Sequence, residues 1–93
     1  MAKPPLRPAR TSQFKRDYKR CKKRGYPMPE LKQIMESLIA GQLLHERHRD
    51  HELSGKWRGH RDCHVRGDWV LIYRIEGDTI TFERTGTHAD LFE

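Results

Sequence analysis

Long apolar runs are absent from this sequence of 93 residues. The longest run, from Trp69 to Tyr73, is far shorter than the roughly 20 apolar residues that a membrane-spanning helix needs. The opening residues, Met1 to Pro5, also lack the apolar segment of a signal peptide. The protein is therefore expected to be cytoplasmic and to have no membrane partner.

Cysteine is scarce as well. Cys21 and Cys63 are the only two cysteines, and they form no CxxC pair, so neither a disulfide framework nor a cysteine-rich zinc site is indicated. The sequence also contains no internal repeat and no low-complexity segment. At this length, with 34% apolar residues, the chain is expected to form one domain with a modest core.

Histidine is more plentiful, and its distribution raises the question of a metal site. His45, His48 and His51 recur every three residues, a spacing that rotates around a helix instead of lining one face. Cys63 and His64 are neighbours in an expected strand, where successive side chains point to opposite faces. Neither pattern matches a known ligand spacing, so we expect no metal and no other cofactor.

Acidic residues are outnumbered: 13 Asp and Glu face 19 Lys and Arg, which gives a net charge of +6. Such a balance favours a polyanionic partner. Much of the excess lies between residues 15 and 24, where a single acidic residue, Asp17, interrupts Lys15, Arg16, Lys19, Arg20, Lys22, Lys23 and Arg24. This segment is either an ordinary solvated helix face or a surface that attracts RNA phosphates regardless of sequence.

The first half of the chain predicts two helices. Thr11 or Ser12 can cap a first helix whose apolar stripe is Phe14, Tyr18 and Cys21, and Gly25 can end it.

A second helix is expected to start at Pro29 and to stop at Gly41, with one apolar face formed by Leu31, Ile34, Met35, Leu38 and Ile39. Residues 1–10 read as a proline-rich leader with a possible edge strand from Leu6 to Arg10.

The second half predicts strands. Residues 42–55 form a polar connector, and residues 56–65, 69–75 and 79–84 are strand candidates separated only by turns. The middle candidate is apolar on both faces and belongs at the centre of the sheet. The expected fold is therefore α+β: a small antiparallel sheet of about four strands, with the two-helix hairpin packed on one side, in a single domain spanning residues 11–93.

Chemically useful side chains gather in this second half. His60, Asp62 and His64 share one face of the first strand, which we expect to face solvent. Arg84 shares a strand face with the core candidates Ile80 and Phe82, so a bulge is expected there. An arginine for phosphate charge, histidines for proton transfer and an aromatic ring for a base are the groups that RNA cleavage without a metal requires. In this half of the chain the arginine is Arg84, the histidines include His88, and the aromatic rings are Trp69 and Phe92. Asp68 lies directly before Trp69.

These residues occur in strings that resemble the YafQ branch of the RelE/ParE toxin superfamily. The strings are Asp50-His51-Glu52-Leu53, Gly55-Lys56-Trp57-Arg58-Gly59, Arg61-Asp62-Cys63-His64, Asp68-Trp69-Val70-Leu71-Ile72-Tyr73 and Arg84-Thr85-Gly86-Thr87-His88. When the two helices predicted in the first half of the chain are included, the resemblance spans about residues 11 to 92. The chain departs from the pattern at the proline-rich leader, at Gly67, where proline is common, and at His60, where an aromatic residue is usual.

The resemblance implies a RelE-like fold and a ribosome-dependent mRNA endonuclease, the toxin of a type II toxin-antitoxin pair. The implied partners are mRNA in the ribosomal A site, the ribosome, and an acidic segment of a DinJ-like antitoxin, with promoter DNA bound only through the antitoxin complex. The family's functional positions fall at His51, His64, Asp68, Trp69, Arg84, His88 and Phe92.

The residue types suggest roles for these positions. His88 is the leading acid or base, and His51 and His64 are its partners or phosphate ligands. Arg84 is expected to clamp the phosphate and Asp68 to orient a histidine or accept a proton. Trp69 and Phe92 are expected to stack on a base or to act as positioning groups. Two alternatives stay open, a ParE-type toxin that acts on a protein and a non-catalytic nucleic-acid-binding module, neither of which needs His88.

Overall fold

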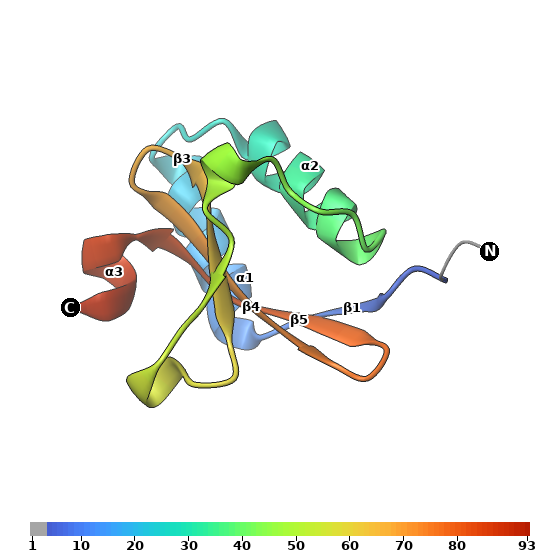
Figure 1. Ribbon diagram of the computed structural model, residues 1–93. Coiled ribbons are helices and arrows are strands. Elements are labelled where there is room, and N and C mark those ends of the chain that lie inside the picture. The colour runs from blue at the N-terminus through green and yellow to red at the C-terminus, as the bar shows by residue number, and fades with distance from the viewer. Residues whose placement is uncertain (1–3) are drawn as a thin grey trace.

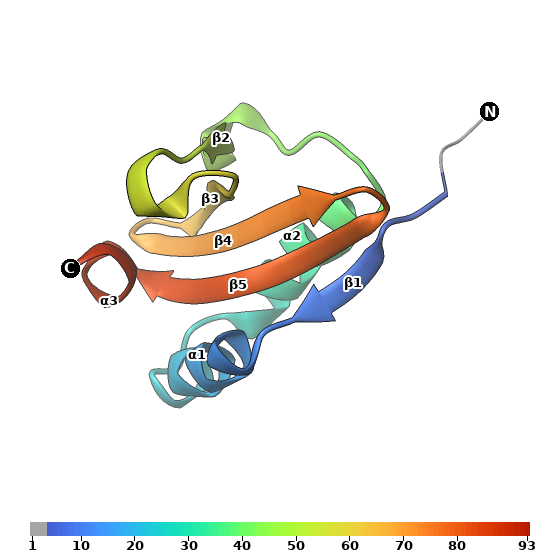
Figure 2. The same ribbon diagram turned by 90° about the horizontal axis from the view of Figure 1, so that it is seen from below.

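A five-stranded sheet forms the centre of the computed structural model, which describes residues 4–93 (Figure 1). Its strands are β1 (Arg7–Arg10), β2 (His51–Glu52), β3 (Arg61–Arg66), β4 (Trp69–Glu76) and β5 (Thr79–Thr87). They lie in the order β1-β5-β4-β3-β2, so β1 and β2 occupy opposite sides of the β4–β5 pair (Figure 2). No helix within residues 4–93 is long and apolar enough to cross a membrane.

The sheet is mixed, whereas the sequence predicted an antiparallel one. Strands β2 to β5 pair antiparallel with their neighbours, but β1 runs parallel to β5. Most of the chain separates β1 from β5, so no hairpin turn forces the two to run in opposite directions. The predicted edge strand is confirmed, with its pairing from Arg7 opposite Thr79 to Arg10 opposite Phe82.

The central position predicted for β4 is confirmed. Residues Trp69 to Tyr73 are all buried, at most 4% exposed, because both faces of β4 are covered. The other two predicted strands have different limits. Residues 55–57 form a short 3₁₀ helix, η2 (Gly55–Trp57), so β3 begins later than expected, and β5 continues three residues beyond its expected end at Arg84.

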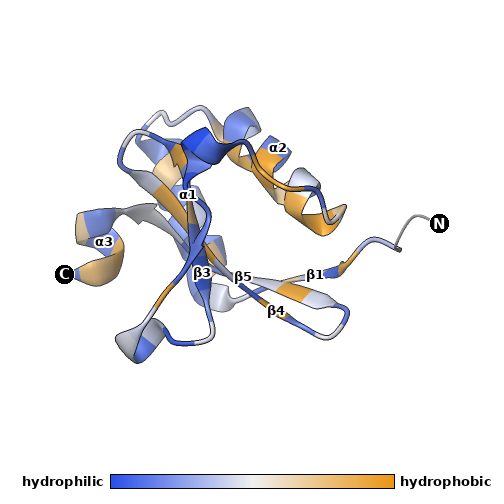
Figure 3. Ribbon diagram, in the orientation of Figure 1, coloured by the Kyte–Doolittle hydropathy of each residue, from blue (hydrophilic) through white to orange (hydrophobic). Residues whose placement is uncertain are grey.

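Two helices, α1 (Ser12–Lys23) and α2 (Met28–Ile39), cover one face of the sheet, as predicted. The hydroxyl of Thr11 caps α1 by accepting a hydrogen bond from the amide of Phe14 at 2.9 Å. The apolar side of α2 is turned toward the sheet (Figure 3). The shared core contains Phe14, Cys21, Leu31, Ile34, Leu38, Cys63, Val65, Trp69, Leu71, Tyr73, Ile80 and Phe82.

The opposite face carries a second, smaller core that was not predicted. A C-terminal helix, α3 (His88–Phe92), packs Leu91 against Val70 and Ile72, with Leu53 and Trp57 at the margin. The short helix is held by a capping box, in which the Thr87 hydroxyl accepts from the Asp90 amide and the Asp90 carboxylate accepts from the Thr87 amide.

Beyond the end of β1, the edge of β5 is covered by α1. The carboxylate of Asp17, which is fully buried, accepts hydrogen bonds from the Thr85 amide at 3.2 Å and from Arg84 Nε and Nη2 at 2.8 and 3.0 Å. Arg84 reaches α1 because the register shifts here: Tyr73 pairs with Phe82, but Ile72 pairs with Arg84. The bulge predicted before Arg84 is confirmed.

Asp90 attaches α3 to α1 in the same way. Its Oδ2 lies 2.7 Å from Arg24 Nη1 and 3.6 Å from Arg20 Nη2, and Arg20 Nη2 also lies 3.3 Å from Asp17 Oδ1. The junction is tight at Gly86, where an added Cβ would come within 2.8 Å of Asp90 Oδ2 and 3.0 Å of Arg20 Nη2. A side chain at Gly86 would therefore displace these ion pairs.

Acid should weaken the fold through these two carboxylates. Burial alone would raise the pKa of Asp17, but hydrogen bonds from Arg84, Gln13 and Thr85 lower it overall. The hydrogen bond from Arg24 likewise lowers the pKa of Asp90. A carboxylate whose pKa is lowered by folding stabilises the fold fully above its unfolded pKa, about 3.9, and loses that contribution as pH falls toward the lowered value.

We therefore expect Asp90→Asn to reduce the free energy of unfolding at pH 7 by about 1–3 kcal/mol and to flatten its decline below pH ~4. Urea denaturation at a series of pH values measures both effects. Asp78→Asn is the matched control, because Asp78 is largely exposed and lies 4.0 Å from Arg7. Identical pH profiles for Asp90→Asn and the wild type would show that the Asp90 ion pairs do not hold α3.

Candidate active site

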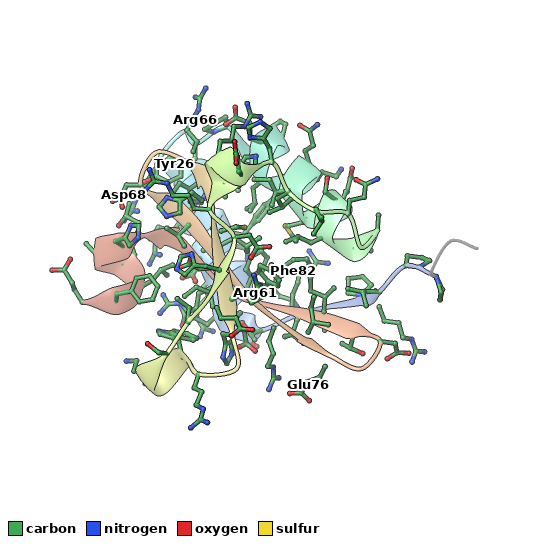
Figure 4. The ribbon with its side chains drawn as sticks, viewed as in Figure 1. Tyr26, Arg61, Arg66, Asp68, Glu76 and Phe82 are labelled. Atoms are coloured by element: carbon green, nitrogen blue, oxygen red, sulfur yellow. The ribbon has the colours of Figure 1, made fainter. Side chains whose placement is uncertain are left out.

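Three histidines from three different elements converge at one end of the sheet. His51 opens β2 opposite Asp62 on β3, His64 lies two residues farther along β3, and His88 opens α3. The ring centroids of His64 and His88 are 5.3 Å apart. Asp68, in the turn between β3 and β4, lies at this same end of the molecule, on the side of α3 (Figure 4).

Each of these imidazoles has its Nδ1 atom engaged. Nδ1 of His51 lies 2.7 Å from the Arg49 carbonyl oxygen, and Nδ1 of His64 lies 3.1 Å from the Gly67 carbonyl oxygen. A carbonyl only accepts hydrogen bonds, so Nδ1 must carry the proton in both rings and the neutral ring has its lone pair on Nε2. The free nitrogen of His51 and of His64 is thus the one that can take up a proton.

Asp68 engages the third ring. One of its carboxylate oxygens accepts hydrogen bonds from Nδ1 of His88 and, at 3.4 Å, from the His88 backbone amide. The hydrogen bond from His88 lowers the pKa of Asp68, so this carboxylate stays ionised at neutral pH. The geometry is that of a carboxylate orienting a histidine, one of the two roles that the sequence suggested for Asp68.

Asp62 is a member of this cluster that the sequence analysis did not select. It was expected to face solvent, but the second core covers this face, and Asp62 is only 3% exposed. Its Oδ1 lies 3.2 Å from Nδ1 of His51. Burial raises the pKa of Asp62, while His51, His64 and His88 act to lower it. The available signal was its position between two histidine-bearing positions of the strand, since Asp62 shares a face with His60 and His64.

The two aromatic candidates have different environments. Phe92 is 38% exposed and lies one helical turn after His88, with the two ring centroids 5.7 Å apart, so its ring is accessible to a base. Trp69 is buried in the shared core between the sheet and the helices α1 and α2, which is called the helix-side core below. There its Nε1 donates to Thr85 Oγ1 at 2.8 Å, and its ring packs edge-on against Tyr26. A base cannot stack on Trp69 in this packing, so only the second of its two expected roles, positioning of the site from within the core, stays a prediction.

Arg84 is also placed differently from the expectation. Its guanidinium is directed to α1 and makes two hydrogen bonds with Asp17, and its side chain is 23% exposed. The predicted role of phosphate clamp requires Arg84 to share these bonds with the substrate. In the structure its role is to join β5 to α1.

Comparisons with known proteins identify the family of this chain. Residues 6–93 match the family model described as "Bacterial toxin of type II toxin-antitoxin system, YafQ". The chain belongs to the YafQ family. It is 46% identical over 83 residues to the mRNA interferase toxin YafQ of Escherichia coli, a match that covers 88% of this chain and 90% of the relative.

Solved structures of YafQ share the fold. The crystal structure of YafQ from E. coli BL21(DE3) superposes with a TM-score of 0.91 at 42% identity and covers 95% of this chain and 99% of that one. YafQ in the E. coli DinJ-YafQ complex gives a TM-score of 0.89 at 42% identity, with the same coverage. A copper-bound mutant toxin from Helicobacter pylori gives 0.89 at 29% identity and covers 94% of this chain and 99% of that one.

The basic helix of this YafQ-family chain is only partly free of ion pairs within the fold. Lys15, Arg16, Lys19, Lys22 and Lys23 are exposed. Arg20, which was predicted to bind substrate with them, is directed instead to Asp17 and Asp90.

The remaining histidines lie outside the cluster of His51, His64 and His88. His48 Nδ1 lies 2.7 Å from the carbonyl oxygen of His64 and so anchors the connector to β3. His60 packs edge-on against Trp57, and its Nε2 lies 3.6 Å from Glu83.

Cys63 is fully buried in the helix-side core. Within residues 4–93, no group of three or more His, Cys, Asp or Glu side chains is arranged to hold a metal ion.

Asp50 fixes the segment that carries His51. The Tyr73 hydroxyl lies 2.7 Å from both carboxylate oxygens of Asp50, and Arg61 Nε lies 3.1 Å from one of them. Burial and the neighbouring Asp50 raise the pKa of Tyr73, so this phenol stays protonated and donates. Strand β2 has only two residues, so we infer that its place depends on this anchor.

Tyr73→Phe tests the anchor, since it removes one hydroxyl and leaves the ring in the core. A hydrogen bond to a charged group contributes about 1.5–3 kcal/mol, so the amides of His51 and Leu53, which pair with β3 at Asp62 and His60, should exchange with solvent about tenfold faster or more. NMR hydrogen exchange measures this rate for each amide. Tyr18→Phe, on α1, is the control and should leave both amides unchanged. Unchanged exchange in Tyr73→Phe would show that Asp50 does not hold β2.

Proposed function

We propose that this YafQ-family toxin is an mRNA interferase, an endoribonuclease that cuts mRNA in the A site of the ribosome without a metal. The observation that carries the proposal is the cluster of His51, His64 and His88, in which each Nδ1 is engaged and each Nε2 is left for proton transfer. The 46% identity to the E. coli mRNA interferase toxin YafQ supports the same activity.

The chemistry uses the 2′-hydroxyl of the RNA as the nucleophile. A general base takes its proton, the 2′-oxygen attacks phosphorus, and a general acid protonates the departing 5′-oxygen, which leaves a 2′,3′-cyclic phosphate. We assign the base to Nε2 of His51 or His64, because their carbonyl partners hold a proton on Nδ1 and so leave the lone pair of the neutral form on Nε2. We assign the acid to His88, because the ionised Asp68 compensates the charge of a proton on that ring.

The remaining parts of the site have supporting roles in this proposal. The exposed ring of Phe92 positions a base beside His88. Arg84 stabilises the phosphate charge if it shares its bonds to Asp17, and the exposed lysines and Arg16 of α1 attract the RNA backbone. A ParE-type poison of a protein, or a passive nucleic-acid-binding module, would need no set of oriented imidazoles.

The proposal includes the partners of such a toxin. Translated mRNA and the ribosome place the protein in the cytoplasm. E. coli YafQ occurs in a complex with DinJ, and we propose that an acidic segment of a DinJ-like antitoxin covers the basic surface of this chain. Promoter DNA would be bound only through that complex.

Substitution of His88 tests the mechanism. His88→Ala should slow cleavage of translated mRNA by roughly two to four orders of magnitude, because it removes the general acid. His60→Gln is the matched control and should cleave at the wild-type rate, since His60 contacts Trp57 and Glu83 and not the cluster. Both variants are compared at equal concentrations of folded protein, judged by circular dichroism.

EDTA should leave wild-type cleavage unchanged if the three histidines act without a metal. Loss of cleavage on chelation, restored by a divalent metal, would overturn the metal-free mechanism, and wild-type rates in His88→Ala would overturn the role of His88. The copper-bound toxin from H. pylori makes copper one of the metals to add back.

Dependence on the ribosome is a separate expectation. Positioning the mRNA can remove about 7 kcal/mol or more of a barrier in favourable cases, so naked RNA should be cut far more slowly than the same RNA under translation. Primer extension on one message, with and without ribosomes, measures the ratio. Equal cleavage in the two reactions would contradict the ribosome-dependent part of the proposal while leaving the nuclease intact.

A further inference from the structure

A groove of about 700 Å³ runs beside the histidine cluster, between α2 and the connector that precedes β2. The α2 side contributes Glu30 and the connector contributes Arg47 and Arg49. His64 and Arg66 of β3 line it as well, so the groove and the proposed active site share His64. Figure 4 shows Arg66 at the same end of the molecule as Asp68.

The groove is cationic, and its charges are available. Arg47 and Arg49 are exposed, and neither forms an ion pair with an Asp or Glu side chain among residues 4–93. Arg66 Nε lies 3.3 Å from Glu30, the one acidic residue of the lining, but both side chains are substantially exposed. Such surface pairs are weak, so a phosphate can compete for Arg66. By contrast, Arg20 and Arg24 of the basic helix are occupied by Asp90.

The groove is also joined firmly to the cluster. The segment around the 3₁₀ helix η1 (Glu46–His48), strongly hydrophilic in Figure 3, is tied to β3 by the bond between His48 Nδ1 and the His64 carbonyl oxygen. His64 in turn contacts the Gly67 carbonyl, next to Asp68. An RNA strand whose phosphate lies at His64 therefore has a continuous cationic path into the groove.

We propose that this groove binds the sugar–phosphate backbone of the mRNA segment next to the cleaved bond, through Arg47, Arg49 and Arg66. The inference rests on the proposed function and adds to it a defined path for the substrate. The contacts are to phosphates, so they act on every sequence alike and weaken as salt is raised. Helix α1 adds a more general attraction through its exposed lysines and Arg16, because Arg20 and the C-cap residue Arg24 are used within the fold.

The test measures binding and not cleavage. A fluorescein-labelled, fully 2′-O-methylated single-stranded RNA cannot be cut through its 2′-oxygen, so its fluorescence anisotropy reports affinity alone. We compare Arg47→Gln/Arg49→Gln with the matched double variant Arg7→Gln/Arg10→Gln, whose charges lie on β1 at the opposite edge of the sheet. All four arginines are exposed, so both variants should fold, which thermal melts verify.

The groove variant should lose affinity equally for oligonucleotides of different sequence. Its slope of log K against log salt should decrease in magnitude by about 1.4, or about 0.7 for each phosphate that is no longer neutralised, while the β1 variant keeps the wild-type slope. Message cleavage by the groove variant should fall in parallel, mainly through a higher KM.

Three outcomes would overturn the inference. Equal slopes for the two double variants would show that the groove holds no phosphate. Unchanged oligonucleotide binding with weaker binding to vacant ribosomes would assign the groove to ribosomal RNA, and unchanged RNA binding with weaker binding to an acidic antitoxin peptide would assign it to a protein. Failure of the proposed function is a different result: the wild type would bind the oligonucleotide but cut no translated message.

Discussion

A buried carboxylate, Asp17, holds the two halves of the molecule together. Every partner of its oxygens is a donor from another turn or element: Gln13 and Arg20 from its own helix, and Arg84 and the Thr85 amide from the edge of β5. An unpaired charge in that position would cost several kcal/mol, so α1 can pack against β5 only where these donors meet it. Arg20 extends the network to Asp90 and thereby to α3. The position of His88 thus depends on a residue in the first helix.

The other side of the active site depends on a separate anchor. His51 lies on a strand of two residues, and the buried Tyr73 hydroxyl and Arg61 fix the preceding Asp50. Both anchors consist of a carboxylate on a peripheral segment that accepts hydrogen bonds from donors on the sheet. The central strand β4 is the rigid element between them, since it is covered on both faces. The segments that carry His51 and His88 are therefore each held in place by contacts with a rigid sheet.

Much of this architecture could be predicted because it follows from local patterns. The Thr11 cap, the apolar stripes of α1 and α2 and the central place of β4 depend on residue spacing within one element. Helix α3 was missed although its capping pair, Thr87 and Asp90, is visible in the sequence, because five residues are too few to show an apolar period.

The unexpected environments at the site have a different origin. An arginine, a tryptophan or an aspartate on a strand has the same local signature whether it meets substrate or protein, and only the tertiary contacts decide. Arg84 donates hydrogen bonds to Asp17, and Trp69 is buried in the helix-side core. Asp62 is buried on the face of the sheet that carries the second core. The parity argument did anticipate the bulge before Arg84, because a charged side chain in register with Ile80 and Phe82 signals a conflict that only a register shift resolves.

The engaged Nδ1 atoms of the three histidines have a consequence for how the rings divide their work. A ring rotated by half a turn about its Cβ–Cγ bond would present a carbon atom to its partner and lose the hydrogen bond. Each imidazole is thereby restricted to one orientation, and in each ring only Nε2 is free to take up or release a proton. For His51 and His64 the restraint is a main-chain carbonyl, which no side-chain substitution can delete. For these two rings the path of the backbone therefore determines which nitrogen is free to exchange a proton.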